Sequence, residues 1–279
     1  MPDATIDLDA YFERIRYTGR PAPNLATLRN IQLRHAMSIP FENLDVLLGR
    51  PIQLDLDSLQ KKQIREKRGG YCFEQNALLA AALDTLGFDV TTLSARVRWK
   101  APEDLITPRT HMLLLVKLAE GPFIVDVGFG GLTPTTPLAL EDLEAQPTTL
   151  EDFRLRRDGE SGYDLQARIG PQWRNVYRFT TERNFPADYK LANWFVSTHP
   201  ESPFTTNLIA SRPDADRRYN LLNGRLTTRY RDGSVDHRPL HSIDEAATAL
   251  ERHFHLPQTN FADRDALRAV IEKQLSIGR

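Results

Sequence analysis

Residues 68–76 read Arg68-Gly69-Gly70-Tyr71-Cys72-Phe73-Glu74-Gln75-Asn76 and place the only cysteine of the chain directly after two glycines. Glycines allow a sharp turn and a close approach of the backbone to another group. The residues that follow are strong helix formers as far as Gly87, so Cys72 is expected in the first turn of a helix. Unpaired N–H groups and the helix dipole at that end favour a thiolate. Cys72 is therefore a candidate nucleophile, although a lone cysteine is often a small buried hydrophobic residue.

The residues before the cysteine are predicted to be helical. Asp7 and Asn24 are both residue types that begin helices, and each precedes apolar residues at helical spacing. We therefore expect residues 1–86 to form a small helical bundle that carries the cysteine. Within it, residues 61–68 are locally basic and are interpreted as a solvated helix face.

Beyond residue 87 the pattern becomes that of strands. Apolar and polar side chains alternate from residue 92 to residue 99. The apolar segments 111–118 and 123–129 predict two further strands joined as a hairpin. Shorter strand-like segments continue to Phe179.

The last part of the chain combines both patterns. Residues 185–203 are polar and contain a predicted connecting helix at 189–195. Predicted turns and helix starts follow at Asn223-Gly224, Asp232-Gly233, Ser242 and Ala262.

Composition restricts the possible functions. The chain has 279 residues and is 41% hydrophobic and 26% charged, as expected of a globular protein with a sizeable core. Its formal net charge of -1 provides no general attraction to nucleic acid or anionic lipid. One cysteine excludes an intramolecular disulfide and a cysteine-based zinc site. The acidic N-terminus does not resemble a secretory signal and no apolar run is long enough to span a membrane, so we expect a cytoplasmic protein.

Two residues further along the chain could activate Cys72. A cysteine nucleophile needs a base and usually a third group that orients the base. His111 begins one apolar strand, and Asp126 interrupts another, where an ionised carboxylate is costly unless it is paired. A hairpin with Leu118 opposite Phe123 puts Asp126 on the same face as His111 but about 13 Å away along the strand. The two side chains would meet only with a bulge, a strong curl or another register, and structural roles for both stay open.

Four motifs together resemble the arylamine N-acetyltransferase family in order and in spacing. They are residues 38–44 (Ser-Ile-Pro-Phe-Glu-Asn-Leu), the cysteine block 68–76, Thr110-His111 and residues 125–130 (Val-Asp-Val-Gly-Phe-Gly). The cysteine block is very specific, whereas the short glycine motif would be weak alone. The match extends through Ser202-Pro203-Phe204 and so covers most of the chain.

The resemblance implies an α+β multidomain fold with a cysteine-protease-like catalytic triad core. Its expected parts are an N-terminal helical bundle (1–86), a central antiparallel β-barrel (87–184), an interdomain helical segment (185–203) and a C-terminal α/β lid (204–279). It also implies that Cys72, His111 and Asp126 form the triad, a question that spacing alone left open.

The implied activity is a ping-pong transfer of an acetyl group from acetyl-CoA, through a thioester on Cys72, to the nitrogen of an arylamine, arylhydrazine or hydrazide. His111 would hold the thiol as a thiolate and later take up the amine proton, and Asp126 would orient the ring. Backbone N–H groups near Cys72 are the expected oxyanion donors. Neither a metal nor a tightly bound cofactor is required.

The resemblance also implies roles around the triad. Three aromatic residues are expected to line the acceptor pocket, namely Phe41, Phe129 and Phe204. Four residues are expected near the pantetheine arm of CoA, namely Thr110, Gly128, Gly130 and Gly131. Four arginines that could contact the CoA phosphates are interpreted instead as solvated surface charges, namely Arg96, Arg98, Arg217 and Arg218.

Other interpretations are compatible with the same residues. A Cys/His/Asp arrangement does not itself choose an amine over water, so a cysteine hydrolase or a transglutaminase-like acyltransferase is an alternative. A catalytically silent relative that binds CoA or another ligand is a third. Xenobiotic metabolism and a dedicated biosynthetic acylation would look alike in the sequence.

Two smaller features have structural interpretations. Glu42 and Arg68 lie in the family motifs, and we hypothesise that they form a buried ion pair that holds the cysteine loop. Residues 253–255 (His-Phe-His) alternate like a strand and lack further metal-binding residues nearby, so a metal site is not expected there.

Overall fold

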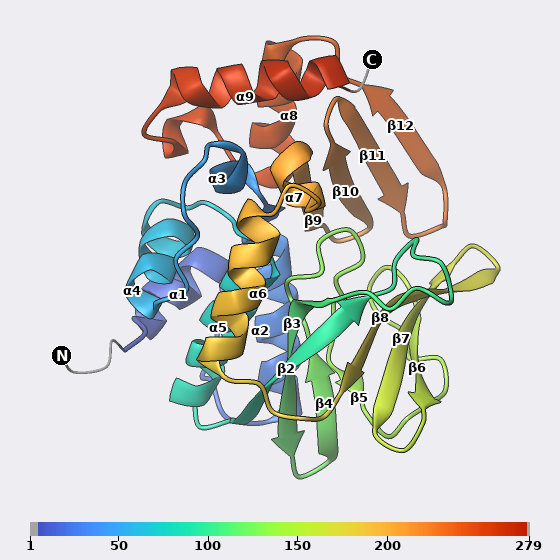
Figure 1. The fold of residues 1–279 in the computed structure, drawn as a ribbon. Coiled ribbons are helices and arrows are strands. Elements are labelled where there is room, and N and C mark those ends of the chain that lie inside the picture. The colour runs from blue at the N-terminus through green and yellow to red at the C-terminus, as the bar shows by residue number, and fades with distance from the viewer. Residues whose placement is uncertain (1–4, 278–279) are drawn as a thin grey trace.

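The computed structural model describes residues 5–277, of which residues 5–86 are mainly helical (Figure 1). Asp7 and Asn24 each accept a hydrogen bond from the backbone N–H three residues later, so both predicted helix starts are confirmed. The elements are α1 (Leu8–Ile15), α2 (Leu25–Ser38), the short strand β1 (Phe41–Glu42), α3 (Leu44–Leu47), α4 (Leu56–Leu59), the π-helix η1 (Gln60–Arg65) and α5 (Cys72–Thr85). The expectation that the N-terminus is not a secretory signal rested partly on residues 1–4, which lie outside the described residues.

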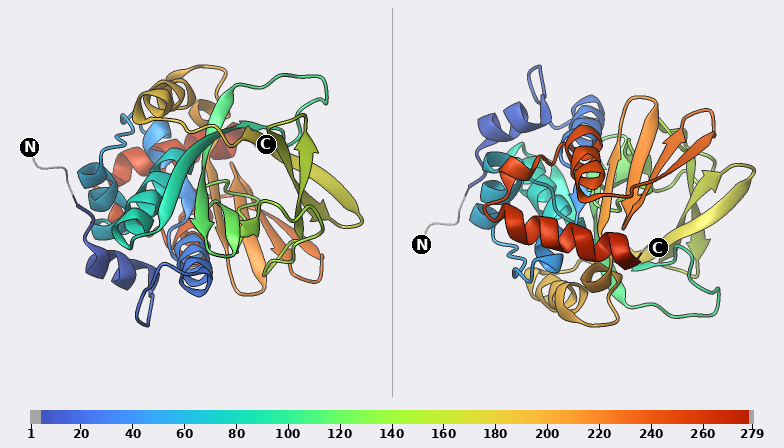
Figure 2. Two further views of the ribbon diagram at one scale, coloured as in Figure 1. Left: turned by 90° about the horizontal axis from the view of Figure 1, so that it is seen from below. Right: turned by 90° about the horizontal axis from the view of Figure 1, so that it is seen from above.

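The middle of the chain forms a seven-stranded antiparallel sheet that curls into a nearly closed barrel (Figure 2). Its order is β5-β4-β3-β2-β8-β7-β6. The strands are β2 (Asp89–Val97), β3 (Arg109–Leu118), β4 (Gly121–Val125), β5 (Leu138–Ala139), β6 (Phe153–Asp158), β7 (Gly162–Ile169) and β8 (Gln172–Thr180). The strands predicted from alternation and from apolar runs are therefore present, except that β4 ends at Val125 and residues 126–129 of the predicted strand form a loop. The structure is α+β.

The β3–β4 hairpin has a different register from the one expected. Leu118 pairs with Gly121 and not with Phe123, because the connecting loop has only two residues. A shift of two residues keeps every side chain on its expected face. It also brings Asp126 to within two residues, or about 7 Å, of the level of His111. A register other than the one with Leu118 opposite Phe123 therefore brings the two side chains together.

The C-terminal part returns to mixed structure. Its elements are α6 (Pro186–Thr198), α7 (Pro203–Thr206), β9 (Ile209–Pro213), β10 (Arg217–Leu222), β11 (Arg225–Tyr230), β12 (Val235–Pro239), α8 (Ile243–Phe254), the 3-10 helix η2 (Gln258–Asn260) and α9 (Arg264–Ile277). Figure 1 shows the C-terminal strands β10, β11 and β12 with α8 and α9 at one end of the molecule. The predicted connecting helix, both predicted turns and the helix start at Ser242 are confirmed.

The second sheet joins the two ends of the chain. Its order is β1-β9-β10-β11-β12, so a strand from the N-terminal part forms its edge. Phe41 pairs with Ser211, and its other side bridges to Gly70. The backbone beside the cysteine block is therefore attached directly to the C-terminal sheet.

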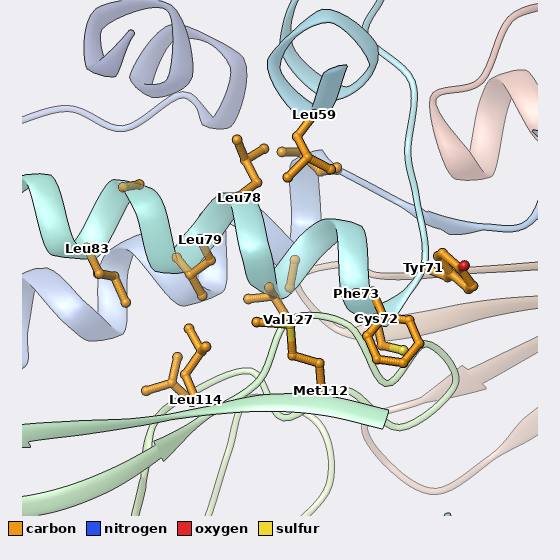
Figure 3. Close-up of a cluster of buried hydrophobic side chains, with 14 of the residues drawn as sticks. Leu59, Tyr71, Cys72, Phe73, Leu78, Leu79, Leu83, Met112, Leu114 and Val127 are labelled. Carbon is orange, nitrogen blue, oxygen red and sulfur yellow. The ribbon is translucent and has the colours of Figure 1, made fainter. Parts of the chain in front are cut away.

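Helix α5 packs along the outer face of the barrel (Figure 3). Leu78 and Leu79 of the helix share a buried cluster with Met112 and Leu114 of β3. Cys72 lies at the start of the helix, near the end of that strand. The opposite face of the barrel sheet has a separate apolar core.

The strand-like alternation at residues 253–255 does not correspond to a strand. His253 and Phe254 belong to the last turn of α8, and His255 ends the helix with a left-handed φ of 57°. Only Phe254 faces the core, which produces the apparent alternation. Within residues 5–277 no group of three or more His, Cys, Asp and Glu side chains could hold a metal ion.

None of the helices in the described part of the chain is long and apolar enough to cross a membrane.

His35 is a fully buried histidine in the helical part. Its Nδ1 lies 2.8 Å from the hydroxyl of Tyr11. Burial and the nearby charge of Arg14 outweigh a hydrogen bond with Gln75 and lower the pKa of His35 from 6.5 to about 3. The folded protein therefore holds His35 neutral, whereas the unfolded chain can protonate it.

We predict that His35 makes the protein less stable in mild acid. Because the folded-state pKa is lowered, the unfolded state binds more protons, and stability is lost as pH falls from 6.5 towards 3. Between about pH 7.5 and pH 5, this group should remove about 2 kcal/mol of unfolding free energy. Urea unfolding of the wild type and His35→Gln at both pH values measures the difference. Equal losses in the two proteins would contradict the prediction.

Candidate active site

Cys72 is the first residue of α5 and is buried, with 4% of its surface exposed. Its Sγ lies 3.6 Å from the carbonyl oxygen of Thr110. The two glycines before it are required by close contacts. A Cβ at Gly69 would lie 2.1 Å from the carbonyl oxygen of Pro40, and one at Gly70 would lie 2.8 Å from Oε2 of Glu74. The turn predicted from these glycines is therefore one that larger residues could not make.

His111 and Asp126 meet inside the barrel wall beside Cys72. Nε2 of His111 lies 2.8 Å from Oδ2 of Asp126, and both side chains are buried. Burial alone lowers the pKa of His111, but the charge and hydrogen bond of Asp126, with a contribution from Cys72, outweigh it and raise the pKa to about 10. Burial raises the pKa of Asp126, but the His111 charge and several hydrogen bonds hold it below its usual value. The pair therefore favours an imidazolium beside a carboxylate.

Asn76 joins the cysteine helix to the two strands. Its Nδ2 lies 2.7 Å from the carbonyl oxygen of Met112 and 3.0 Å from Oδ1 of Asp126. Its Oδ1 accepts from the backbone N–H of Val127 at 3.1 Å. No role for Asn76 was expected from the sequence. Its position four residues after Cys72, on the same helix face, was the available signal.

The loop after Asp126 lies directly against the cysteine. A Cβ at Gly128 would lie 2.6 Å from Cα of Cys72 and 2.8 Å from Nδ2 of Asn76. The backbone N–H of Gly128 donates to Oδ1 of Asp126 at 2.8 Å. The glycine therefore allows the loop to approach the helix while it fixes the carboxylate.

A cavity of about 770 Å³ opens at Cys72 and His111. Phe41, Phe129 and Phe204 all line it, as do Thr110, Gly128 and Gly131. The rings of Phe41 and Phe204 are 5.9 Å apart, and Phe129 meets His111 edge to face at 5.2 Å. Gly130 is not part of the lining and instead lies against the Phe41 ring, where a Cβ would be 3.1 Å from it. Asp126 is behind His111 and also does not line the cavity.

A cationic rim lines part of this cavity, with one residue from the loop after β2 and the others from the C-terminal sheet. The cations are Lys100, Arg225 and Arg229, and His237 lines the cavity beside them. Arg225 and Arg229 are four residues apart on β11 and therefore point to the same face of the sheet. The pairing of β12 with β11 puts His237 on that face as well. No role was expected for these residues, because they come together only when the strands pair.

Two of the four arginines interpreted as solvated are buried. Arg218 has 0% of its surface exposed and binds Glu151 at 2.8 Å and the carbonyl oxygen of Thr133 at 2.9 Å. Arg98 donates to the carbonyl oxygens of Pro102 and Glu103. For these two residues the interpretation as solvated charges is wrong, because carbonyl and carboxylate groups from other segments replace the water.

A charge cluster of four buried side chains and the largely buried Lys62 lies under the start of α5. It consists of Glu42, Asp45, Lys62, Arg68 and Glu74. Arg68 lies 3.1 Å from Glu42 and 2.7 Å from Asp45, which confirms the hypothesised buried ion pair. Lys62 and Arg68 contradict the interpretation of residues 61–68 as a solvated face. Their neighbour Lys61 is exposed as expected.

Comparisons with known proteins agree on one family. A family model described as N-acetyltransferase matches residues 24–261. The arylamine N-acetyltransferase of Mycobacterium tuberculosis is 42% identical over 275 residues, covering 97% of this chain and 96% of that protein. The arylamine N-acetyltransferase of Mycolicibacterium smegmatis is 41% identical over 271 residues, covering 96% and 98%. The structure of the Mycobacterium marinum arylamine N-acetyltransferase in complex with CoA has a TM-score of 0.92 at 39% identity, covering 96% of this chain and 99% of that one.

We predict that Gly128→Ala is far more damaging than Gly131→Ala. The new Cβ at residue 128 would meet the backbone of Cys72, which cannot move without shifting α5. We expect a loss of about 1–3 kcal/mol of unfolding free energy, as in other overpacked sites. At Gly131 the nearest atom is Oδ1 of the Asn220 side chain at 3.3 Å, which can yield. Urea unfolding midpoints measure both variants, and equal effects would contradict the prediction.

Proposed function

The chain belongs to the arylamine N-acetyltransferase family, and from this membership and the cavity geometry we propose that it carries an acetyl group from acetyl-CoA through Cys72 to an arylamine nitrogen. Acetyl transfer to arylamines, with acetyl-CoA as cosubstrate, is the activity of the family. The observation that carries the route through Cys72 is its position at the start of α5, beside the His111–Asp126 pair and at the cavity.

In the first half-reaction, the Cys72 thiolate attacks the thioester carbonyl of acetyl-CoA. A sulfur–carbon bond forms at Cys72, the bond to the CoA sulfur breaks, and the leaving thiolate takes a proton from the His111 imidazolium. The raised pKa of His111 supports an imidazolium before this step. The oxyanion is stabilised by N–H groups of the first turn of α5, which have no partner within the helix.

In the second half-reaction, the amine nitrogen attacks the acetyl group on Cys72. The carbon–sulfur bond breaks and Cys72 leaves as a thiolate. His111, neutral after the first half-reaction, accepts the proton that the amine loses. Asp126 holds the ring through Nε2, which leaves Nδ1 for the thiol and the substrates.

The aromatic side chains are proposed to bind the acceptor and to exclude water. Phe41, Phe129 and Phe204 offer flat apolar surfaces on which an aromatic amine can stack. Exclusion of water protects the thioester until the amine arrives. Arylhydrazines and hydrazides present a similar nitrogen and are included as acceptors.

The cationic rim is proposed to bind the phosphates of CoA. Arg225, Arg229 and His237 line the cavity from β11 and β12, and arginine forks suit phosphate oxygens. Thr110, Gly128 and Gly131 line the cavity near Cys72, where the pantetheine arm must end. Gly130 contributes indirectly, by supporting Phe41.

We also propose the three-part organisation implied by the motifs, with a helical bundle, a β-barrel and an α/β lid joined by α6. The separate apolar clusters of the barrel and the C-terminal part support it. A cytoplasmic location is proposed on the single free cysteine, which suits a reducing compartment.

We predict that a covalent acetyl adduct forms on Cys72. Intact-protein mass spectrometry after mixing with acetyl-CoA should show one added acetyl group in the wild type and none in Cys72→Ala. Addition of 4-aminobenzoate or isoniazid should remove the group and produce the acetylated amine. A folded wild type that forms no adduct and no product would favour a silent binding protein, and loss of the acetyl group to water at the same rate without amine would favour a hydrolase.

We predict that the arginines of the cationic rim are needed for donors that carry phosphates. Arg225→Gln and Arg229→Gln should each lower kcat/KM for acetyl-CoA by about 10- to 150-fold, the loss of one charged hydrogen bond. The thioester acetyl-N-acetylcysteamine, which lacks phosphates, should react equally well with the wild type and both variants. Arg217→Gln is the matched control, because Arg217 lies on the same sheet, pairs with Asp216 and does not line the cavity. Equal losses with both donors would contradict a phosphate-binding role.

A further inference from the structure

Lys62 is a largely buried cation in contact with the helix that carries Cys72. Its Nζ lies 2.7 Å from Oε1 of Glu74 and 2.9 Å from Oδ2 of Asp45, with Glu42 at 3.9 Å. Only 12% of the side chain is exposed. The mechanism proposed above does not use this residue.

The π-helix η1 explains why Lys62 faces inwards. The backbone carbonyl of Lys62 accepts from the N–H of Arg68, and Nε2 of Gln63 donates to the carbonyl of Glu74 at 3.1 Å. The first bond fixes the end of η1, and the second holds η1 against α5. Lys61, one residue earlier, points outwards with 69% of its side chain exposed. A π-helix is rare and often occurs at functional sites, so its use here to bury one lysine is informative.

Glu74 links Lys62 to the start of α5. Its Oε1 binds Lys62, and its Oε2 accepts from the backbone N–H of Tyr71 at 3.0 Å, next to Cys72. The carboxylate therefore caps the turn that presents the cysteine. It also puts a negative charge within one helical turn of the thiol. A like charge so close disfavours a thiolate.

The cluster as a whole carries three carboxylates and two cations, and Arg50 lies at its edge, 3.7 Å from Asp45. Removal of Lys62 would leave Arg68 as the remaining cation of the cluster. Burial raises the pKa of Glu74, and Lys62 is the main group that opposes this. Without Lys62, the negative charge of Glu74 beside the thiol would lose the cation that balances it.

We infer that Lys62 is a positioning residue, which holds the Glu74 cap and cancels its charge so that a thiolate can form at Cys72. The inference rests on the nucleophile assigned under the proposed function. The titratable groups that interact with Cys72 are His111 from β3, Tyr71 from its own helix start and Tyr189 from α6. Lys62 and Glu74 alter the charge near these groups without contacting the substrates.

The test is the pH profile of Cys72 alkylation by iodoacetamide, followed by intact-protein mass spectrometry. In Lys62→Met the midpoint of the profile should rise by about 0.5 pH unit or more, since an uncompensated carboxylate disfavours the thiolate. Alkylation near pH 7 should slow about 3-fold or more. Lys61→Met is the matched control, because it removes the same charge from the preceding residue. That side chain is exposed, so the midpoint should stay unchanged.

Two further variants separate the electrostatic role from a structural one. Glu74→Gln keeps an acceptor for the Tyr71 N–H but removes the charge, so its midpoint should fall below that of the wild type. The double variant Lys62→Met/Glu74→Gln should return close to the wild-type midpoint. If Lys62→Met does not fold, Glu74→Gln alone still tests the inference. An unchanged midpoint in folded Lys62→Met or Glu74→Gln, or a double variant no nearer the wild type than Lys62→Met, overturns it.

Alkylation does not require acetyl-CoA, so the two proposals fail separately. Shifted midpoints in a protein that forms no acetyl adduct would overturn the proposed function and support the role of Lys62. An acetyl adduct with unshifted midpoints would do the reverse.

Discussion

The hydrogen bonds of one buried amide set the position of the cysteine helix against the barrel. Asn76, one turn after Cys72, donates to the carbonyl of Met112 and to Asp126, and accepts from the N–H of Val127. Apolar packing of α5 on β3 supplies stability, but it tolerates small displacements of one element along another. Directional hydrogen bonds in a dry site tolerate much less, because each unmet partner is costly. The geometry around the thiol therefore depends on this side chain.

A second set of buried polar groups attaches the C-terminal sheet to the same region. Phe41 and Glu42 form β1, so one residue lines the cavity while the next belongs to the charge cluster. Asn43 then donates to the carbonyls of Phe204 and Asn207 and accepts from the N–H of Ile209. Two aromatic walls from distant parts of the chain are thereby fixed to each other. Buried charges are expensive to desolvate, so the cluster is better understood as specifying this arrangement than as a source of stability.

The errors of sequence interpretation have identifiable causes. The expected hairpin register differs from the observed one by two residues. Gly121 was assigned to the turn, but it pairs as part of β4. Lys62 and Arg218 were interpreted as solvated because their partners, Glu74 and Glu151, are not recognisable from local pattern. Charged residues have no periodic signature of burial, since the outcome depends on whether a distant carboxylate or carbonyl replaces water. The helix starts at Asp7, Asn24, Cys72 and Ser242, by contrast, depend on neighbours within a few residues and were predicted correctly.

Local pattern alone was sufficient for the helix that begins at Cys72, for the glycines before it and for the change from helices to strands near residue 87, because turns, caps and apolar periodicity act over a few residues. The motifs were sufficient for the family. Only the tertiary structure brought His111 and Asp126 to 2.8 Å, gathered the cationic rim from paired strands and buried Lys62. These features depend on strand register and on the desolvation of charges, and both are decided by contacts between residues far apart in the chain.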